Sequence, residues 1–280
     1  NAVLTNPFFI NPPPNPPPPH NLPAPTTSFL GRDIELAQIA ALIADPTCRL
    51  LTLLGPGGIG KSRLALQAAY GHTAPNRRFV DGIFFVSLAA ATQLDEAIPL
   101  IAAAVGGIFS GQRAPRSELL HHVQSRALLL VLDNCEHLVD EATFFAEMLA
   151  AAPQLMVLVT SRARLRLYEE SIFDVRALSV PPAEVHKAAE LIASSAVQLF
   201  VERSRRVNLA FDFIAEAEAV AAICRLVEGV PLGIELAAGW VRNHSCAAIA
   251  EAIRQGIDFL ASQVQNAPPR HRSLRAAFDH

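Results

Sequence analysis

The sequence predicts an α/β fold in which a three-layer domain with a parallel sheet is followed by a small all-α helical domain. Short apolar runs alternate with helical patterns up to about residue 180, which is typical of a parallel sheet covered on both faces. After Pro181 and Pro182 the strand patterns stop, and amphipathic helical patterns continue. A glycine-rich loop at residues 55–62 joins the first apolar run to a helical pattern, which is the order expected at the start of such a domain.

Five short apolar runs are the expected strands. They lie at residues 50–54, 83–86, 127–132, 155–159 and 172–175. The helices expected among them lie at residues 33–44, 61–70, 94–105 and 139–151. Asp33 is expected to cap the first helix, whose inward side chains would be Ile34, Ala37, Ile39, Ala40, Ala41 and Ile43.

The helical domain is expected to contain four helices. They lie at residues 196–206, 217–227, 231–242 and 247–254, and Pro231 can open the third at its first turn. We therefore divide the chain into a proline-rich linker at 1–26, an α/β domain at 27–182, a helical domain at 183–265 and a final segment at 266–280. The linker carries proline runs at 12–14 and 16–19, which favour an extended polyproline conformation; a ligand for an SH3-like domain is the alternative.

Composition excludes several classes of protein. The net charge of −3 gives no basic footprint, so we expect contact with DNA only through domains absent from this chain. The sequence has no run of 18 apolar residues, and we expect no membrane span. Four widely spaced cysteines (48, 135, 224 and 246) favour reduced thiols and a cytoplasmic location. The chain does not begin with methionine, and we expect it to be part of a longer protein.

The glycine-rich loop carries the strongest functional signal. Residues 55–62 read Gly-Pro-Gly-Gly-Ile-Gly-Lys-Ser, which is a complete phosphate-binding P-loop. Glycines let successive backbone N–H groups point at phosphate oxygens, and the following helix directs its positive end at the anion. The chain is therefore expected to be a P-loop NTPase that binds nucleotide through Gly55, Gly57, Gly58, Ile59, Gly60, Lys61, Ser62 and Arg63. Lys61 would contact the β- and γ-phosphates, and Ser62 would bind Mg²⁺.

A second signature follows the third expected strand. Mg²⁺ also needs a carboxylate, usually at the end of a strand neighbouring the P-loop strand, and Asp133 ends the run Leu-Leu-Leu-Val-Leu. The next residue is Asn134, which can orient a water but cannot accept its proton. Glu136 is then the nearest candidate for a general base, although a solvated glutamate at the start of a helix explains it equally well. Slow hydrolysis is expected.

An arginine follows the fourth expected strand. Arg162 comes directly after Thr160 and Ser161, where a guanidinium could reach the γ-phosphate and report its presence. Arg164 and Arg166 are nearby competitors for this role, and a solvated basic loop is the alternative explanation.

Four segments in this order resemble a known family. They are Phe29-Leu30-Gly31-Arg32, the P-loop, the run ending Asp133-Asn134, and the turn Gly229-Val230-Pro231-Leu232. Together they are similar to the NB-ARC-like nucleotide switches of the STAND class of P-loop ATPases. The similarity is strongest to the bacterial branch found in LuxR-like and antibiotic-regulator-type transcriptional regulators, through Leu-Asp-Asn-Cys-Glu-His-Leu at 132–138 and Val-Thr-Ser-Arg at 159–162. The resemblance covers residues 27 to 280.

The resemblance implies roles for individual residues. Gly31 and Arg32 would flank the adenine, Asp133 would support the metal, and Pro231 would pack on the nucleotide from the helical domain. Val230 and Asn134 depart from the residues more usual in the family, and Asn134 puts the hydrolytic rate in doubt. Residues 270–277 look like the first helix of a winged-helix domain, which is expected to begin in the segment 266–280.

The sequence thus predicts an ATP- and ADP-binding signalling switch that uses Mg²⁺, with Lys61, Asp133, Arg162 and Glu136 as catalytic candidates. It would hydrolyse ATP slowly and regulate a larger, transcriptional protein, with nucleotide-dependent self-association. Two alternatives stay open: a scaffold that holds ADP without turnover, and a P-loop kinase acting on a small molecule.

Overall fold

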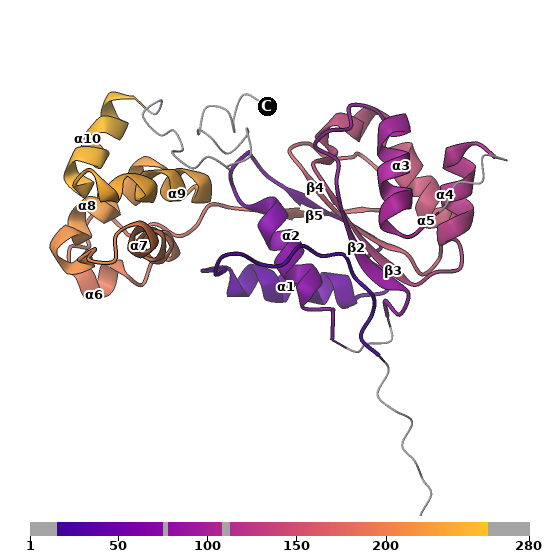
Figure 1. Ribbon diagram of the computed structural model, residues 1–280, viewed down its shortest axis with the longest axis horizontal. Coiled ribbons are helices and arrows are strands. Elements are labelled where there is room, and N and C mark those ends of the chain that lie inside the picture. Colours follow the sequence, from indigo (N-terminus) through magenta and orange to yellow (C-terminus); the bar gives the residue numbers. More distant parts are fainter. Residues whose placement is uncertain (1–15, 75–77, 108–112, 257–280) are drawn as a thin grey trace, which may run out of the picture.

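The computed structural model describes residues 16–74, 78–107 and 113–256 of the chain. Two parts lie side by side: an α/β half built on one sheet, and a half made only of helices (Figure 1). The predicted fold class is confirmed. The first 15 residues of the expected linker, the end of the expected helical domain and the whole expected winged-helix segment at 266–280 lie outside the described residues.

The sheet has five parallel strands in the order β2-β3-β4-β1-β5. Their bounds are β1 Leu50–Leu54, β2 Gly82–Ser87, β3 Leu128–Asp133, β4 Met156–Ser161 and β5 Glu170–Asp174. All five predicted strands are present. The expectation that the strand carrying Asp133 neighbours the P-loop strand is wrong, because β4 lies between β1 and β3.

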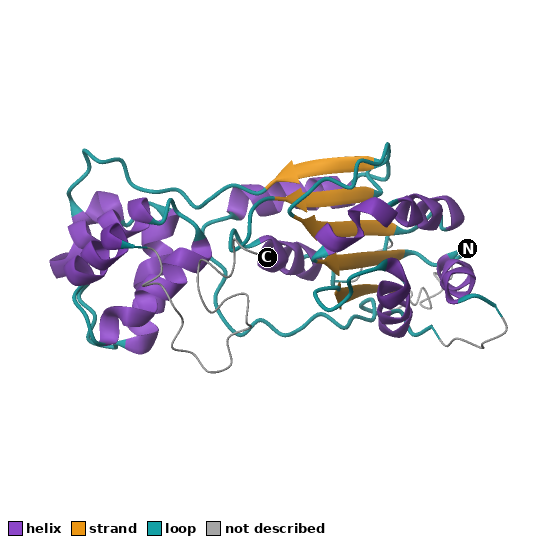
Figure 2. Ribbon diagram, turned by 90° about the horizontal axis from the view of Figure 1, so that it is seen from above, coloured by secondary structure: helices purple, strands orange, loops and turns teal. Residues whose placement is uncertain are grey.

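Helices cover both faces of the sheet (Figure 2). On one face lie α1 Asp33–Ala44 and α2 Lys61–Tyr70; on the other lie α3 Leu94–Ala104, α4 Pro115–Val123, the 3₁₀ helix η1 Cys135–Glu141 and α5 Thr143–Ala151. Side chains of β3 alternate between the two cores: Leu128 and Leu130 pack with α3 and α5, whereas Leu129 and Val131 pack with α1 and α2. This period of two follows from the pleat of a strand.

Three local expectations for the α/β half differ from the structure. The helix expected at 139–151 is divided into η1 and α5, because the Ala142 N–H donates to the carbonyl three residues back. Asp33 is the first residue of α1 and not its cap: Arg32 occupies the N-cap position, without a side-chain capping hydrogen bond. Ile34 is 73% exposed because the buried stripe of α1 runs through Ile39 and Ile43. Helix α4 had no predicted counterpart, since only two of its residues are buried.

The helical half contains α6 Ala188–Leu191, α7 Ser195–Val207, α8 Phe213–Leu226, α9 Pro231–Gly239, the 3₁₀ helix η2 Trp240–Arg242 and α10 Cys246–Gln255. It has its own apolar core, to which α7, α8, α9 and α10 all contribute. Asp212 caps α8 by accepting hydrogen bonds from two backbone N–H groups, and Ser245 caps α10.

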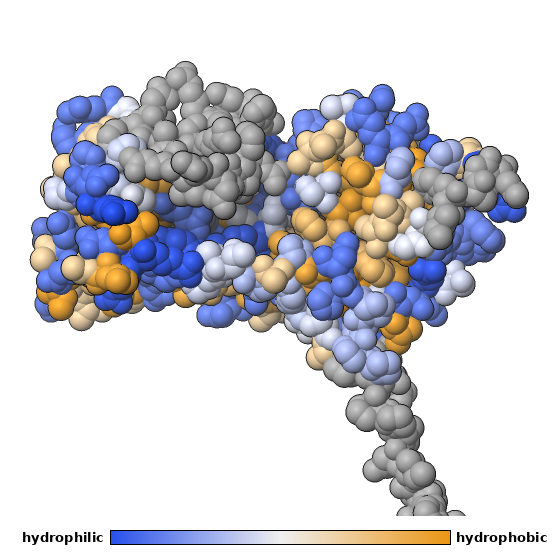
Figure 3. Space-filling view, viewed as in Figure 1, coloured by the Kyte–Doolittle hydropathy of each residue, from blue (hydrophilic) through white to orange (hydrophobic). Residues whose placement is uncertain are grey.

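The visible surface of the helical half is mainly hydrophilic, whereas apolar residues gather on the α/β half around α3 and β2 (Figure 3).

Residues 16–30, which we call the N-terminal arm, differ from the free linker expected over residues 16–26. His20 forms a parallel β-bridge with Ile83 at the edge of the sheet. The Asn21 side chain donates to the Phe85 carbonyl (3.0 Å) and accepts from the Phe85 N–H (2.6 Å). The arm thereby covers the outer edge of β2, and its prolines offer no N–H that could pair with a further strand.

Among the residues that the structure describes, none of the helices has the length and hydropathy of a membrane span.

Candidate nucleotide-binding site

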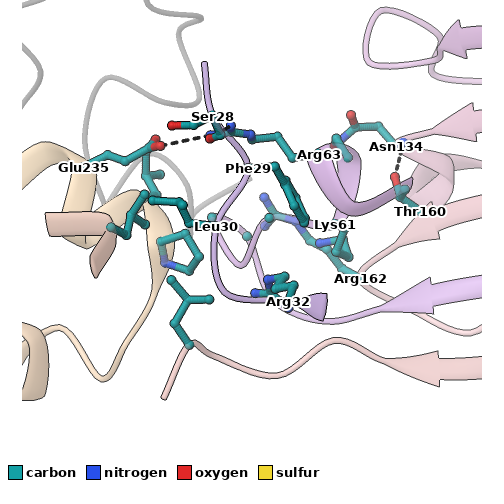
Figure 4. A pocket seen from close by; sticks show the side chains of 18 residues that line it. Ser28, Phe29, Leu30, Arg32, Lys61, Arg63, Asn134, Thr160, Arg162 and Glu235 are labelled. Carbon is teal, nitrogen blue, oxygen red and sulfur yellow. Dashed lines mark hydrogen bonds and ion pairs between the residues drawn. The ribbon is translucent and has the colours of Figure 1, made fainter. Parts of the chain in front are cut away.

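A pocket opens between the two halves at the carboxyl edge of the sheet (Figure 4). Its polar side is formed by the P-loop and the ends of β3 and β4: Gly57, Gly58, Gly60, Lys61, Ser62, Asn134, Thr160 and Arg162. Its apolar side is formed by the N-terminal arm and the helical half: Phe29, Leu30, Leu178, Leu199, Pro231 and Leu232. One side therefore suits an anion, and the other suits a flat apolar ring.

The P-loop has the backbone that a phosphate cradle requires. Gly58 and Gly60 have φ angles of +73° and +94°, which side chains other than glycine rarely adopt. A Cβ atom at Gly58 would lie 2.9 Å from the Cβ of Leu232, so the absence of a side chain also lets the helical half approach. The Lys61 ammonium donates to the carbonyls of Gly55 (2.7 Å) and Pro56 (3.0 Å), which ties the two ends of the loop together.

Arg32 braces the P-loop from within the protein. Its side chain is buried and donates to the carbonyls of Ile59 (2.7 Å) and Arg176 (3.0 Å). Burial lowers the pKa of the Arg32 guanidinium, and Glu35 at 3.6 Å partly opposes that shift. Arg32 therefore lines the pocket and also holds the loop in place. The neighbouring Gly31, with φ +73°, lies against Ser195 of α7, where a Cβ would come within 2.3 Å.

Asp133 is linked to the pocket by a hydrogen bond. Its buried carboxylate accepts from the Thr160 hydroxyl at 2.6 Å, and that hydroxyl accepts from the Asn134 N–H at 3.1 Å. Thr160 and Asn134 line the pocket, whereas Asp133 lies behind them. The insertion of β4 between β1 and β3 creates this arrangement, which the sequence analysis did not foresee.

Arg162 and Glu136 form an ion pair beside the pocket. The Arg162 Nε lies 3.4 Å from Glu136 Oε1, and the Asn134 amide donates to the same oxygen at 3.3 Å. Arg162 lines the pocket, and Glu136 lies outside the lining with its second oxygen buried and without a hydrogen-bond partner. The structure therefore brings together two residues that the sequence assigned to separate roles.

The neighbouring thiol, that of Cys135, is fully buried. Burial raises the pKa of Cys135 well above its ordinary value, and nearby Asp133 adds to the shift. In the described residues, no group of three His, Cys, Asp or Glu side chains is placed to hold a metal ion.

The helical half touches the P-loop directly. The Leu232 N–H, in the first turn of α9, donates to the Gly58 carbonyl at 3.2 Å. Pro231 lies beside it and lines the pocket, and its packing on a nucleotide stays a prediction. Phe29, Leu30, Leu178, Leu199 and Glu235 also line the pocket and were missed as site residues, because isolated apolar side chains and a helical glutamate carry no motif.

The residues fit a magnesium nucleotide. The P-loop backbone and Lys61 would hold the phosphates, while Ser62 and Thr160 would offer oxygen atoms to Mg²⁺, with the Asp133 carboxylate behind Thr160. The apolar side can accept a base.

Comparison with known proteins agrees with this reading of the motif. Residues 44–167 match the family described as an AAA domain. Residues 44–167 thus form a P-loop domain similar to that family. Among curated relatives, a Mycobacterium tuberculosis protein named "Putative HTH-type transcriptional regulator" is 38% identical over 233 residues, covering 82% of this chain and 24% of the relative. An uncharacterised M. tuberculosis protein is 35% identical over 254 residues, covering 89% of this chain and 60% of the relative. The chain thus spans about a quarter of the length of the first of these relatives.

The solved structures that align with TM-scores above 0.5 share the fold of this chain. The ADP form of the ORC2 protein from Aeropyrum pernix aligns with a TM-score of 0.51 at 13% identity, covering 84% of this chain and 70% of that one. PCH-2 of Caenorhabditis elegans aligns with a TM-score of 0.52 at 11% identity, covering 80% and 69%. A STAND protein with a tetratricopeptide repeat sensor from Pyrococcus horikoshii aligns with a TM-score of 0.46 at 16% identity, covering 84% and 33%.

Proposed function

We propose that this P-loop ATPase domain binds ATP or ADP with Mg²⁺ and acts as a STAND-type signalling switch within a larger transcriptional regulator. The observation that carries the proposal is the hydrogen bond from the Leu232 N–H to the Gly58 carbonyl. It joins the phosphate loop to the helical half, so a change at the phosphates can reach that half through a single contact. The name of the M. tuberculosis relative supports the transcriptional context.

Discrimination between ATP and ADP is assigned to Arg162. Its guanidinium lines the pocket and is held by Glu136, from which it can turn to a γ-phosphate. A contact available only with ATP shifts the equilibrium between two arrangements by its own free energy, which is what a switch requires. ADP would favour the closed arrangement described above, and ATP would favour another in which the parent protein self-associates.

Hydrolysis is expected to reset the switch slowly. Asn134 cannot accept a proton, and Glu136 is held by Arg162 and Asn134. If Glu136 is the general base, it can act only after Arg162 has released it.

Two rival functions remain to be separated from the switch. A scaffold would hold ADP and never turn over, and a small-molecule kinase would pass the phosphoryl group to an acceptor. Single-turnover hydrolysis of radiolabelled ATP separates all three: slow release of phosphate supports the switch, no product after hours supports the scaffold, and stoichiometric labelling of an added acceptor supports the kinase.

The identity of the nucleotide can be measured directly. The purified chain is denatured and the released small molecules are identified by mass spectrometry. ADP or ATP at close to one molecule per chain supports the proposal. A chain that carries no nucleotide and binds none in calorimetry with excess Mg-ATP would overturn it.

A further inference from the structure

Three segments that are distant in the sequence meet at one side chain beside the pocket. Arg63 of α2 lies between the N-terminal arm and helices α7 and α9 of the helical half, and it lines the pocket together with Ser28 and Glu235 (Figure 4). We call the group Thr27, Ser28, Arg63, Arg203 and Glu235 the Arg63 junction. The P-loop pattern predicts Arg63 as a nucleotide contact, but it gives no reason for these neighbours.

The arm side of the junction is held by one nitrogen of the guanidinium. Arg63 Nη2 donates to the Thr27 hydroxyl (2.7 Å), the Thr27 carbonyl (3.3 Å) and the Ser28 carbonyl (2.7 Å). The same guanidinium lies over the ring of Phe29, with 5.9 Å from its central carbon to the ring centre. Arg63 thus fixes the stretch of the arm that forms the apolar side of the pocket.

The helical side is held by the other nitrogen. Arg63 Nη1 donates to Glu235 Oε1 of α9 at 3.2 Å, and Arg203 Nε of α7 donates to the same oxygen at 3.0 Å. Glu202 pairs with Arg203 and Arg206, and it accepts from the Ser28 hydroxyl at 2.7 Å. The network therefore closes on itself: the arm contacts α2 and α7, and α2 contacts α9.

The Arg63 guanidinium makes its contacts with other groups of the protein. Nη1 and Nη2 donate to carboxylate, hydroxyl and carbonyl oxygens on two sides, and the guanidinium lies over an aromatic ring within cation–π distance. Burial lowers the pKa of Arg63, and the Glu235 carboxylate opposes this shift. A single exposed ion pair contributes little, but a shared network of charges in a fixed geometry contributes more.

We propose that Arg63 and Glu235 are positioning residues that hold the N-terminal arm and the helical half on the P-loop helix, and so set the rate at which nucleotide leaves. This inference rests on the proposed function. Neither residue needs to touch a phosphate for this role. A nucleotide in the pocket would lie against the arm and the helical half, and movement of either one away from the pocket breaks contacts of Arg63.

The chain offers a closely matched control. Arg116 of α4 and Glu147 of α5 form an Arg–Glu pair at 2.5 Å, and Arg116 lies 5.2 Å over the ring of Phe144. The Arg116 side chain is 42% exposed and that of Arg63 is 39% exposed. The two pairs differ in location, because the control pair joins two helices of the α/β half away from the pocket.

Release of a fluorescent ADP analogue, followed by stopped flow on the 280-residue chain, tests the inference. We expect Arg63→Ala and Glu235→Gln each to speed release about tenfold or more, and the double variant to release no faster than the faster single variant, as for two members of one network. Thr27→Val should have a smaller effect, because two carbonyl acceptors for Arg63 remain. Arg116→Ala and Glu147→Gln should release ADP at the wild-type rate.

Hydrogen exchange in the nucleotide-free chain tests the positioning separately. Arg63→Ala and Glu235→Gln should raise exchange at residues 27–31, and Arg116→Ala should leave it unchanged. The inference is overturned if the wild-type chain holds ADP and both junction variants release it at the wild-type rate, or if exchange in the arm is unchanged. A wild-type chain that binds no ADP overturns the proposed function, and the exchange measurement still decides whether the junction holds the arm. If Arg63→Ala does not fold, Glu235→Gln carries both tests alone.

Discussion

The two halves of the molecule face the same pocket with different chemistry. The α/β half presents backbone and charge: the glycines of the P-loop, Lys61, and Arg162. The helical half presents apolar side chains such as Leu199 and Leu232, together with the carboxylate of Glu235. Most of the first surface is built by the continuous β1–P-loop–α2 segment, with residues at the ends of β3 and β4 beside it, whereas the second is assembled from separate helices.

This difference suggests that the two halves contribute differently to nucleotide affinity and to the time for which nucleotide stays bound. Groups that contact phosphates contribute binding free energy in any arrangement of the two halves. Groups of the helical half contribute only when it is closed on the P-loop, as it is here through Leu232 and Gly58. Variants in the first half should therefore reduce affinity, and variants in the second should chiefly shorten residence.

The largest effect is expected at Lys61. Lys61→Ala removes the ammonium at the P-loop, and losing charge-assisted contacts to phosphates should weaken binding by about 100-fold or more in calorimetry. Lys187→Ala is the control, because Lys187 is an exposed lysine of the helical half. Undiminished affinity of the Lys61 variant would remove the distinction between the halves, since the P-loop would then contribute nothing special.

A smaller effect is expected where the halves touch. Gly58→Ala places a Cβ 2.9 Å from that of Leu232 and also strains a backbone with φ +73°. Gly106 has the same φ, but a Cβ there would meet nothing within 4 Å. We expect both variants to lose about 1–2 kcal/mol of unfolding free energy from the strained backbone. Only Gly58→Ala should also speed ADP release, because only its Cβ meets the helical half. We expect release to be roughly tenfold faster, which corresponds to about 1.4 kcal/mol. Equal ADP release from the two variants would show that the contact with Leu232 does not matter for retention.

The smallest effect is expected at Pro231. Pro231→Ala relaxes the first turn of α9 and should shorten ADP residence a few-fold, with a change in unfolding free energy of about 0.4–1 kcal/mol from the freer unfolded chain. Pro115→Ala is the control, because Pro115 also opens a helix, α4 of the other half. Identical residence times for the two variants would indicate that the helical half does not close on the nucleotide.

Elements that depend on neighbouring residues could be predicted from the sequence, whereas elements that depend on distant contacts could not. Strands β1 and β3 were placed to within a residue, because short apolar runs ending in Gly55 or Asp133 are local patterns. Helix α4 was missed because its apolar stripe is too sparse, and the docked arm was missed because proline runs read locally as extended chain. The roles assigned to Asp133, Glu136 and Arg162 stay predictions, although the structure places them at one edge of the sheet.

By itself, the sequence determined the P-loop, because a glycine-rich turn between a strand and a helix depends only on neighbouring residues. It also determined the two-part fold, because the local pattern of apolar residues changes after Pro182. The tertiary structure decided which side chains share the pocket. The order of the strands put Thr160 beside Asp133, and the meeting of the two halves put Arg63 beside Glu235, 172 positions away. Contacts at that separation depend on how whole layers pack, and no local pattern of residues encodes them.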